Sequence, residues 1–484
     1  MRCCLINPLG RDSSIAYSPP LGLAYIAATL EGEGHEVRIV DRVAIKYRDG
    51  EADLKELDEI TKREILKFEP ELIGIGATTI QVYDLSHVAR MIRQVPEGGN
   101  YPVIAGGFHP TAEPDLTLTD YPEIDIVCRG EGEFTILDLA SGKKLEDVPG
   151  LTFRKKGELC STQDRVPPHN LDILPVPARH LLDMDFYCRR NDRVISCIPL
   201  KVATMLTSRG CPYDCKFCSS RLIYKSPRYH SPEYVLREID LLLENYPIEA
   251  ISFVDCELLP TRKRLKKICE GLIEQKLHKK FKWGCSLRAN LVDKEILALM
   301  KQAGCIFVNY GFESGSQRML DSMNKRVTVD DNYRAARLTN EAGILVNSAM
   351  IINLPGETEE DMLATIAFLK NNGNRIYSTG LNPLLPLPGS PYYREFLDQG
   401  LLEYSDKLWE EIGVLPKSIE KIRLYSQMPR EKFTELYNKA NRLATRNNIK
   451  NYIRVNWSRH PLFLLRKATK SFGKVRSLLS RNVA

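Results

Sequence analysis

Short apolar runs alternate with amphipathic stretches over the first 140 residues. The runs are rich in Val, Ile or Leu, end at turn-forming residues, and cover residues 3–8, 37–41, 72–79, 103–107 and 124–129. Between them, residues 21–33 and 85–94 have the apolar spacing of helices. The repeated strand–helix unit predicts a doubly wound, Rossmann-like (flavodoxin-like) α/β domain over residues 1–140, with a ligand crevice at the carboxyl ends of its parallel strands.

A second alternation of strand and helix patterns begins near residue 198. It follows residues 141–197, whose short strands and Pro-rich turns indicate an interdomain connector. The strand patterns cover residues 201–207, 250–254, 282–287, 306–311, 346–352 and 379–384, and helix patterns include 232–245, 262–275, 294–302 and 359–369. Six such units predict a partial (β/α)6 TIM-like barrel over residues 198–400, with its active site at the strand carboxyl ends. Residues 401–484 have a helical composition.

The composition is that of a globular protein. Of 484 residues, 43% are hydrophobic and 27% charged, with no apolar run of about 18 residues and no signal-peptide pattern, so we expect a cytoplasmic protein. The 13 cysteines lack the regular spacing of a disulfide framework, which favours reduced thiols.

The positive charge is concentrated in the C-terminal region. The net charge is +6, yet 12 Lys and Arg and no acidic residue follow Glu435, so the rest of the chain is net acidic and nucleic-acid binding is not expected. An apolar stripe beside basic residues is formed by Leu462, Leu465, Phe472, Val475 and Leu479. Two interpretations stay open: peripheral contact with the inner face of an anionic membrane, which would favour a lipid-like substrate, and packing on the barrel.

Three cysteines directly after the first barrel strand are the clearest chemical signal. Cys211, Cys215 and Cys218 stand in Cys-Pro-Tyr-Asp-Cys-Lys-Phe-Cys, with no fourth cysteine nearby. Four thiolates would complete an iron–sulfur cluster or a structural zinc site, whereas three leave one iron open to another ligand. A zinc site completed by a distant ligand is the alternative.

This motif, with an aromatic residue before its last Cys, resembles the cluster loop of the radical S-adenosylmethionine (SAM) superfamily. Gly-Phe-Glu-Ser-Gly from Gly311 and Asn-Leu-Pro-Gly-Glu-Thr from Asn353 also resemble its strand-end segments, with Asn353 replacing a Gly. The resemblance implies a 4Fe–4S cluster on the three cysteines and SAM bound to its free iron. The SAM-contacting residues that it implies are Phe217, Asp255, Glu257, Ser286, Arg288, Glu313 and Asn353.

The N-terminal domain resembles the cobalamin-binding domain of one radical SAM class. The similarity lies in Pro-Pro-Leu-Gly-Leu-Ala-Tyr-Ile-Ala, in Gly-Gly-Phe-His-Pro-Thr and in Arg-Gly-Glu-Gly-Glu. It implies cobalamin contacts from Pro20, Leu21, Gly22, Thr78, Thr79, Gly106, Gly107, His109, Arg129, Gly130 and Glu131. The cobalt-ligating motif Asp-x-His-x-x-Gly is absent from the sequence, so the sequence does not assign a lower ligand to cobalt. The alternative is a degenerate Rossmann-like domain that binds no cofactor.

The resemblance implies a cobalamin-dependent C-methyltransferase acting on an unactivated carbon of a small molecule, supported by an external electron donor. One SAM would methylate reduced cobalamin, and a second would give the deoxyadenosyl radical that activates the substrate. A ring-forming or rearrangement enzyme, like the anaerobic magnesium-protoporphyrin ester cyclase, is the main alternative, with a hydrophobic, lipid or tetrapyrrole substrate. The non-enzymatic alternative is a cobalamin- or metal-binding regulatory protein.

Overall fold

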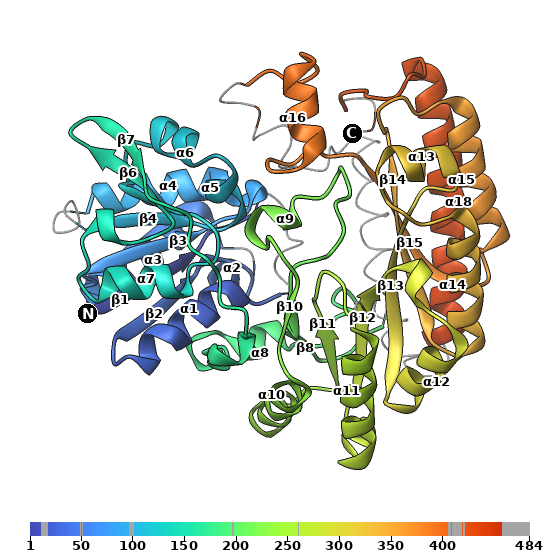
Figure 1. Ribbon diagram of the computed structural model, residues 1–484, viewed down its shortest axis with the longest axis horizontal. Coiled ribbons are helices and arrows are strands. Elements are labelled where there is room, and N and C mark those ends of the chain that lie inside the picture. The colour runs from blue at the N-terminus through green and yellow to red at the C-terminus, as the bar shows by residue number, and fades with distance from the viewer. Residues whose placement is uncertain are drawn as a thin grey trace, which may run out of the picture.

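The computed structural model describes residues 1–10, 18–48, 50, 52–95, 101–195, 198–259, 261–404, 408, 419 and 422–456. An N-terminal α/β domain lies beside a half-open barrel of parallel strands, and C-terminal helices cover the outer side of the barrel (Figure 1). This architecture confirms the fold class predicted from the sequence.

The N-terminal sheet has the flavodoxin-like strand order. Its parallel strands run β2-β1-β3-β4-β5 across the sheet. Their bounds are β1 Arg2–Asn7, β2 Glu36–Asp41, β3 Leu72–Gly76, β4 Val103–Gly106 and β5 Ile126–Cys128. The flanking helices are α1 Leu21–Gly32, α2 Arg42–Tyr47, α3 Leu54–Phe68, α4 Val82–Arg93, α5 Phe108–Ala112, α6 Pro114–Asp120 and α7 Glu133–Ala140.

Helices cover both faces of this sheet, which explains why its strands are continuous apolar runs. Successive side chains of β1 alternate between the faces: Cys3 and Leu5 pack with residues of α1 and α7, whereas Cys4 and Ile6 pack with residues of α3 and α4. A ligand must therefore approach from the strand ends.

Part of the predicted connector belongs to the N-terminal sheet. Strands β6 (Leu151–Lys155) and β7 (Glu158–Ser161) extend it by antiparallel pairing from β5. The connector then includes a short helix, α8 (Met184–Tyr187), before the barrel begins.

The barrel contains six parallel strands in chain order, as predicted. They are β8 Val202–Met205, β11 Ala250–Phe253, β12 Lys282–Leu287, β13 Cys305–Glu313, β14 Leu345–Ile352 and β15 Ile376–Pro383. The helices around them include α10 Pro232–Asn245, α11 Arg262–Glu274, α12 Lys294–Gln302, α13 Gln317–Ser322, α14 Val329–Glu341, α15 Glu359–Asn371 and α16 Pro391–Asp398. The terminal strands β8 and β15 do not pair with each other, so the barrel stays open.

Helix α18 (Arg430–Asn456) covers the open edge of β15. Asn448 pairs with Thr379 as a neighbouring strand would, accepting from its backbone N–H at 2.8 Å and donating to its carbonyl at 2.9 Å. Side-chain amides thus satisfy an edge that would otherwise attract another strand.

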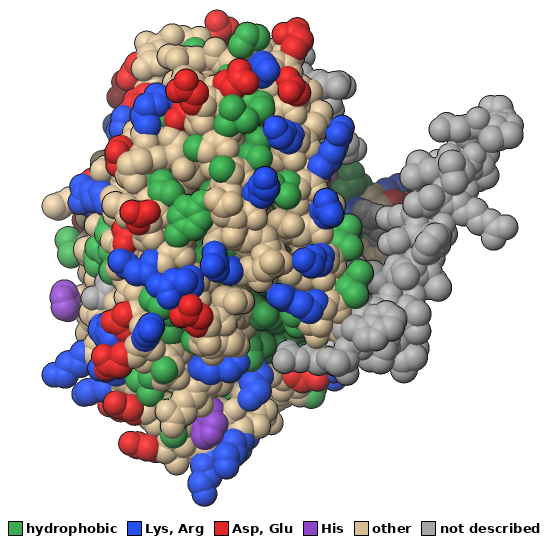
Figure 2. All heavy atoms as spheres, turned by 90° about the vertical axis from the view of Figure 1, so that its right-hand side faces the viewer, with side chains coloured by type: hydrophobic (Ala, Val, Ile, Leu, Met, Phe, Trp, Pro, Cys, Tyr) green, Lys and Arg blue, Asp and Glu red, His purple; other side chains and the backbone are tan. Residues whose placement is uncertain are grey.

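The outer face of the barrel side is rich in basic side chains across its middle (Figure 2). Within α18, Arg442, Arg446, Lys450 and Arg454 recur every four residues and are exposed. None of the helices in the described ranges has the length and hydropathy that crossing a bilayer requires. The apolar stripe from Leu462 to Leu479 lies outside the described residues.

Candidate functional site at the junction of the two domains

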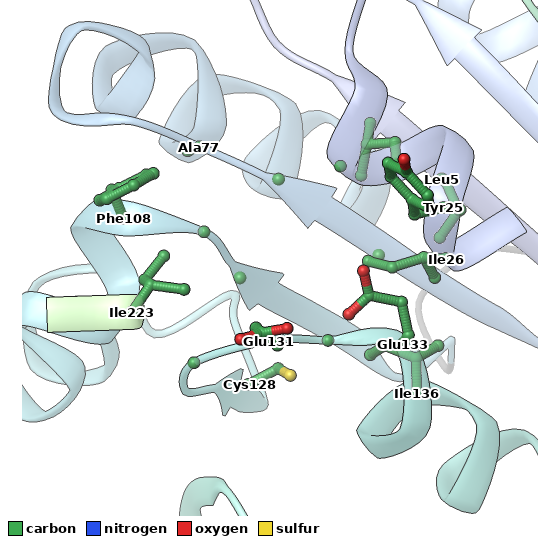
Figure 3. Close-up of a pocket in the computed structure, with 18 of the residues that line it drawn as sticks. Leu5, Tyr25, Ile26, Ala77, Phe108, Cys128, Glu131, Glu133, Ile136 and Ile223 are labelled. Carbon is green, nitrogen blue, oxygen red and sulfur yellow. The ribbon is translucent and has the colours of Figure 1, made fainter. Parts of the chain in front are cut away.

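A cavity of about 310 Å³ lies where the N-terminal sheet ends and the barrel begins. Its apolar walls include Leu5, Ile26 and Ile136 on the sheet side and Phe108 and Ile223 toward the barrel (Figure 3). The cavity spans β1 and β3, the point at which the strand order reverses in a flavodoxin-like sheet. This is the position at which such folds bind flat cofactors.

The cavity can admit a large flat ring because glycines form much of its wall. Gly107 has φ +97°, and a Cβ there would lie 2.6 Å from the carbonyl oxygen of Ala77, so only glycine fits. A Cβ on Gly22, by contrast, would meet nothing within 4 Å. Among the residues predicted to contact cobalamin, those that line the cavity are Gly22, Thr78, Gly106, Gly107, Gly130 and Glu131. The glycine-rich wall and apolar lining fit a corrin.

The other predicted cobalamin residues lie around this cavity but do not line it: Pro20, Leu21, Thr79, His109 and Arg129. His109 is buried with its Nδ1 3.4 Å from the Thr79 hydroxyl, and burial lowers its pKa to about 3, so its imidazole is neutral. Arg129 donates to the Thr152 hydroxyl at 3.2 Å and pairs with Asp164, which ties β6 to the end of β5.

Sequence reasoning missed the residues that the barrel contributes to the cavity. These are Leu206, Arg209, Ile223 and Tyr224, which stand on either side of the cysteine motif. Within the domain it also missed Tyr25 and Ile26, although both belong to the helix start that carried the resemblance. The docking of the two domains completes the pocket.

The cluster loop leaves strand β9 (Ser208–Arg209) and returns through β10 (Arg228–Tyr229), with α9 (Ser220–Ile223) inside it. The Cys218 N–H donates to the Cys215 carbonyl at 3.1 Å, and the Lys216 N–H donates to the Met323 carbonyl at 2.9 Å. The loop is therefore anchored to the segment after α13.

The thiols of this loop lie beside one cationic side chain. The Arg288 guanidinium is 3.5 Å from the centre of the Tyr213 ring, and its Nη1 is 3.7 Å from Cys215 Sγ. Within the described ranges, no three His, Cys, Asp or Glu side chains are already drawn together as a metal site. Three thiols on one loop, with a cation beside them, fit a cluster whose fourth iron stays open.

Buried carboxylates from two strand ends face this loop. Glu313 has φ +60° and pairs with Lys325 Nζ at 2.6 Å, and the same Nζ lies 5.5 Å from the centre of the Phe217 ring. Burial raises the pKa of Glu257 to about 7, against the opposing charges of Arg288 and Lys325. The structure thus brings Phe217, Glu257, Arg288 and Glu313 together, and adds Lys325, which no strand-end pattern could indicate.

Asp255 and Ser286 have local hydrogen-bonding roles. Asp255 Oδ1 accepts from the Thr207 N–H at 3.0 Å and from the hydroxyls of Thr207 and Ser208 at 2.9 and 2.5 Å. It therefore fixes the chain immediately before the cluster loop. The Ser286 hydroxyl accepts from Asn309 inside the barrel at 3.4 Å.

Asn353 adopts φ +63°, the left-handed conformation that Asn tolerates and Gly prefers. Its side chain donates to the Arg423 carbonyl at 2.8 Å and accepts from the N–H groups of Tyr425 and Ser426 at 2.9 and 3.3 Å. The amide therefore holds the segment before α18 against the barrel. SAM contact by Asn353 stays a prediction. Because the side-chain amide is engaged in these hydrogen bonds, the contact would be made by the backbone of Asn353.

Glu357 gives a test of this turn. It accepts from the Asn353 N–H at 2.8 Å, and burial raises its pKa from 4.5 to about 8. The folded protein thus keeps a proton that the unfolded chain releases, so stability falls as pH rises from 4.5 to 8. Because Gln does not titrate, we expect the unfolding free energy of Glu357→Gln relative to that of the parent to rise by about 5 kcal/mol between pH 4.5 and 8. Urea unfolding of both proteins from pH 5 to 9 measures the difference, and parallel pH curves would contradict it.

The comparisons with known proteins agree with this geometry. The radical SAM superfamily model matches residues 205–369 and the B12 binding domain model matches residues 12–140. The uncharacterized methyltransferase PH0819 of Pyrococcus horikoshii is 36% identical over 357 residues, which cover 73% of either protein. The chain therefore belongs to the radical SAM superfamily, in the group whose barrel follows a B12-binding domain, and it is an enzyme. Its cofactors are a 4Fe–4S cluster, SAM and cobalamin.

Two further comparisons concern activity and fold. The anaerobic magnesium-protoporphyrin IX monomethyl ester cyclase of Cereibacter sphaeroides is 26% identical over 390 residues, which cover 79% of this chain and 61% of the cyclase. The radical SAM methyltransferase TsrM of Kitasatospora setae, solved with cobalamin and a 4Fe–4S cluster, superimposes with a TM-score of 0.66 at 19% identity, covering 84% of this chain and 79% of TsrM. The second likeness confirms the fold of both domains together.

Proposed function

We propose that the protein is a cobalamin-dependent methyltransferase that moves a methyl group from SAM to an unactivated carbon of a small molecule. The observation that carries the proposal is the shared wall of the two cofactor sites: Arg209 lines the cobalamin cavity and stands two residues before Cys211. When bound, the cluster and SAM supply a radical that removes a substrate hydrogen, and cobalamin supplies the methyl group. The greater similarity to the Pyrococcus methyltransferase than to the cyclase supports methyl transfer.

The chain's own residues would bind and orient these groups. Arg288 offers a permanent positive charge at the cluster loop, suited to a carboxylate, and Phe217 and Lys325 form an adjoining wall. The apolar lining of the cavity excludes water from the corrin face. An external electron donor is required to reduce the cluster.

Product analysis tests the proposal. The protein is reconstituted anaerobically with iron, sulfide and cobalamin, then supplied with SAM, a reductant and an extract of its native cells. Methyl transfer predicts both S-adenosylhomocysteine and 5′-deoxyadenosine. Deoxyadenosine without S-adenosylhomocysteine would support the ring-forming alternative, and the absence of both would support a regulatory protein.

The lining of the barrel interior supports a proposal for the chemical class of the substrate. A second cavity, of about 300 Å³, lies there and is lined by Ser252, Ser286, Asn309 and Asn347 among others. Asn347 Nδ2 donates to Asn309 Oδ1 at 2.7 Å, and Asn309 Nδ2 donates to the Ser286 hydroxyl at 3.4 Å. Among the described residues, Asn347 Oδ1 then receives no hydrogen bond. This row suits a neutral hydrogen-bonding group better than a hydrocarbon. The amides are half-buried, and a bound substrate would bury them fully, where an unpaired amide is costly.

Replacing the amide of Asn347 tests this substrate class. With trideuteromethyl SAM, we expect label in the water-soluble fraction of the extract. We expect at least about 10-fold less label with Asn347→Leu, since one or two hydrogen bonds to the substrate are lost. Ser348→Ala is the matched control, because Ser348 follows on the same strand and bonds Thr379 on the opposite face at 3.0 Å. Equal label from both variants, or label in the lipid fraction, would contradict a polar substrate.

Peripheral membrane contact is a separate proposal, supported by the exposed basic residues of α18 and the basic sequence that follows it. Co-sedimentation with anionic but not with neutral vesicles is the result expected. No sedimentation with either kind would refute it.

A further inference from the structure

Four buried charged side chains join the N-terminal domain to the barrel beside the cobalamin cavity. Arg209 binds Glu131 at 2.6 Å and Glu133 at 2.5 Å, and Arg228 also pairs with Glu131. Each of these side chains is at most 8% exposed. The two carboxylates and two guanidiniums balance, which permits their burial, whereas removing one would leave an unpaired buried charge.

The two arginines sit at the base of the cluster loop. Arg209 in β9 and Arg228 in β10 are directly paired across the antiparallel ribbon, and the loop between them carries all three cluster cysteines. Gly210, between Arg209 and Cys211, has φ +87°, and a Cβ there would lie 2.7 Å from the Ser226 carbonyl oxygen. The loop is thus closed tightly at its base, so a shift of Arg209 displaces Cys211.

The two glutamates sit in the wall of the cobalamin cavity. Both line it, on the turn from β5 into the first residue of α7, and Figure 3 draws both among the side chains around the cavity. The Arg209 guanidinium also lines the cavity and lies 4.9 Å from the centre of the buried Tyr25 ring. The same ion pairs therefore contact both cofactor regions.

We propose that Arg209, Arg228, Glu131 and Glu133 form a positioning network that fixes the cluster loop relative to the cobalamin cavity. The sequence predicted that Glu131 contacts cobalamin. In the network, Glu131 orients Arg209 and Arg228. Arg209 acts as a positioning residue, because it holds Cys211 and the corrin wall in one arrangement. The proposal rests on the proposed function only in assuming that both cofactors work together.

Hydrogen exchange on the full chain without cofactors tests the coupling. Glu133→Gln keeps the shape of the side chain and removes its charge. We expect residues 207–229, in the other domain, to exchange about 10-fold faster or more, because Arg209 loses a buried partner. Arg209→Met should conversely speed exchange in residues 126–140.

Asp84→Asn is the matched control. It breaks a buried pair with Arg42, at 2.8 Å, that lies wholly within the N-terminal domain. We expect it to leave residues 207–229 unchanged. If Glu133→Gln changes exchange only within its own domain, or if Asp84→Asn affects residues 207–229 equally, the proposal is overturned. Neither outcome depends on methyl transfer, so this test and that of the proposed function can fail separately.

Pulsed EPR on the loaded protein supplies a second readout. The reduced cluster and cob(II)alamin should show one narrow dipolar coupling in the parent and a broadened one in Glu133→Gln, with Arg209→Lys between them. Identical couplings in all three proteins, with both cofactors fully bound, would overturn the positioning role.

Discussion

Cys215→Ala is expected to abolish cluster assembly and 5′-deoxyadenosine formation while leaving cobalamin bound. Cys215 is the buried member of the three and lies beside Arg288, so its loss leaves two thiols for a cluster that needs three. None of the three cysteines lines the cobalamin cavity. Iron and cobalt analysis, together with a deoxyadenosine assay, measures whether the variant loses the cluster and its product while it keeps cobalamin.

Cys188→Ala is the matched control for this change. Cys188 directly follows α8, outside the cluster loop, and is a buried free cysteine like Cys215. We expect it to keep iron, cobalamin and deoxyadenosine formation. Normal turnover by Cys215→Ala, or equal loss in both variants, would refute the assignment of the cluster ligands.

Gly22→Trp is expected to prevent cobalamin binding while the cluster still assembles, the reverse of the result expected for Cys215→Ala. Gly22 lies in the first turn of α1 and lines the cavity, and a side chain there enters open space. The indole would occupy room that the corrin needs, whereas the helix itself tolerates a residue larger than glycine. We expect at least about a 100-fold loss of cobalamin affinity, which corresponds to about 3 kcal/mol.

Gly22→Ala controls for the backbone. Alanine is a better helix former than glycine by about 0.5–1 kcal/mol, and it adds one carbon where nothing lies within 4 Å. We expect it to bind cobalamin as the parent does and to unfold at a slightly higher temperature. Full cobalamin binding by Gly22→Trp, measured by absorbance after desalting, would show that the corrin lies elsewhere.

The sequence was sufficient to predict the parallel strands of both sheets, because each is a short apolar run that a doubly wound sheet or a barrel buries on one or both sides. Helices 232–245 and 294–302 were predicted at their observed bounds, since Ser231 and Asp293 cap them through hydrogen bonds to backbone N–H groups. The replacement of a family glycine by Asn353 also has a physical reason in its positive φ. Local rules thus decide local structure.

What the sequence could not predict depends on contacts between distant segments. Strands β6 and β7 were assigned to the connector because they form an antiparallel hairpin, in which β6 pairs with β5 and β7 with β6. Such a hairpin departs from the parallel strand–helix alternation that defined the domain. In the sequence, Arg209 is only a residue two positions before the first cysteine of the motif. Its ion pairs with Glu131 and Glu133 form only when the two domains dock. Lys325 likewise becomes a site residue through the fold of the loop after α13.

EPR of the anaerobically reconstituted, reduced protein, recorded before and after SAM is added, tests the central claim most directly. An iron held by Cys211, Cys215 and Cys218 with one open position predicts a 4Fe–4S signal whose g values change when SAM binds. Zinc in place of iron, or an iron–sulfur signal that SAM leaves unaltered, would contradict the account.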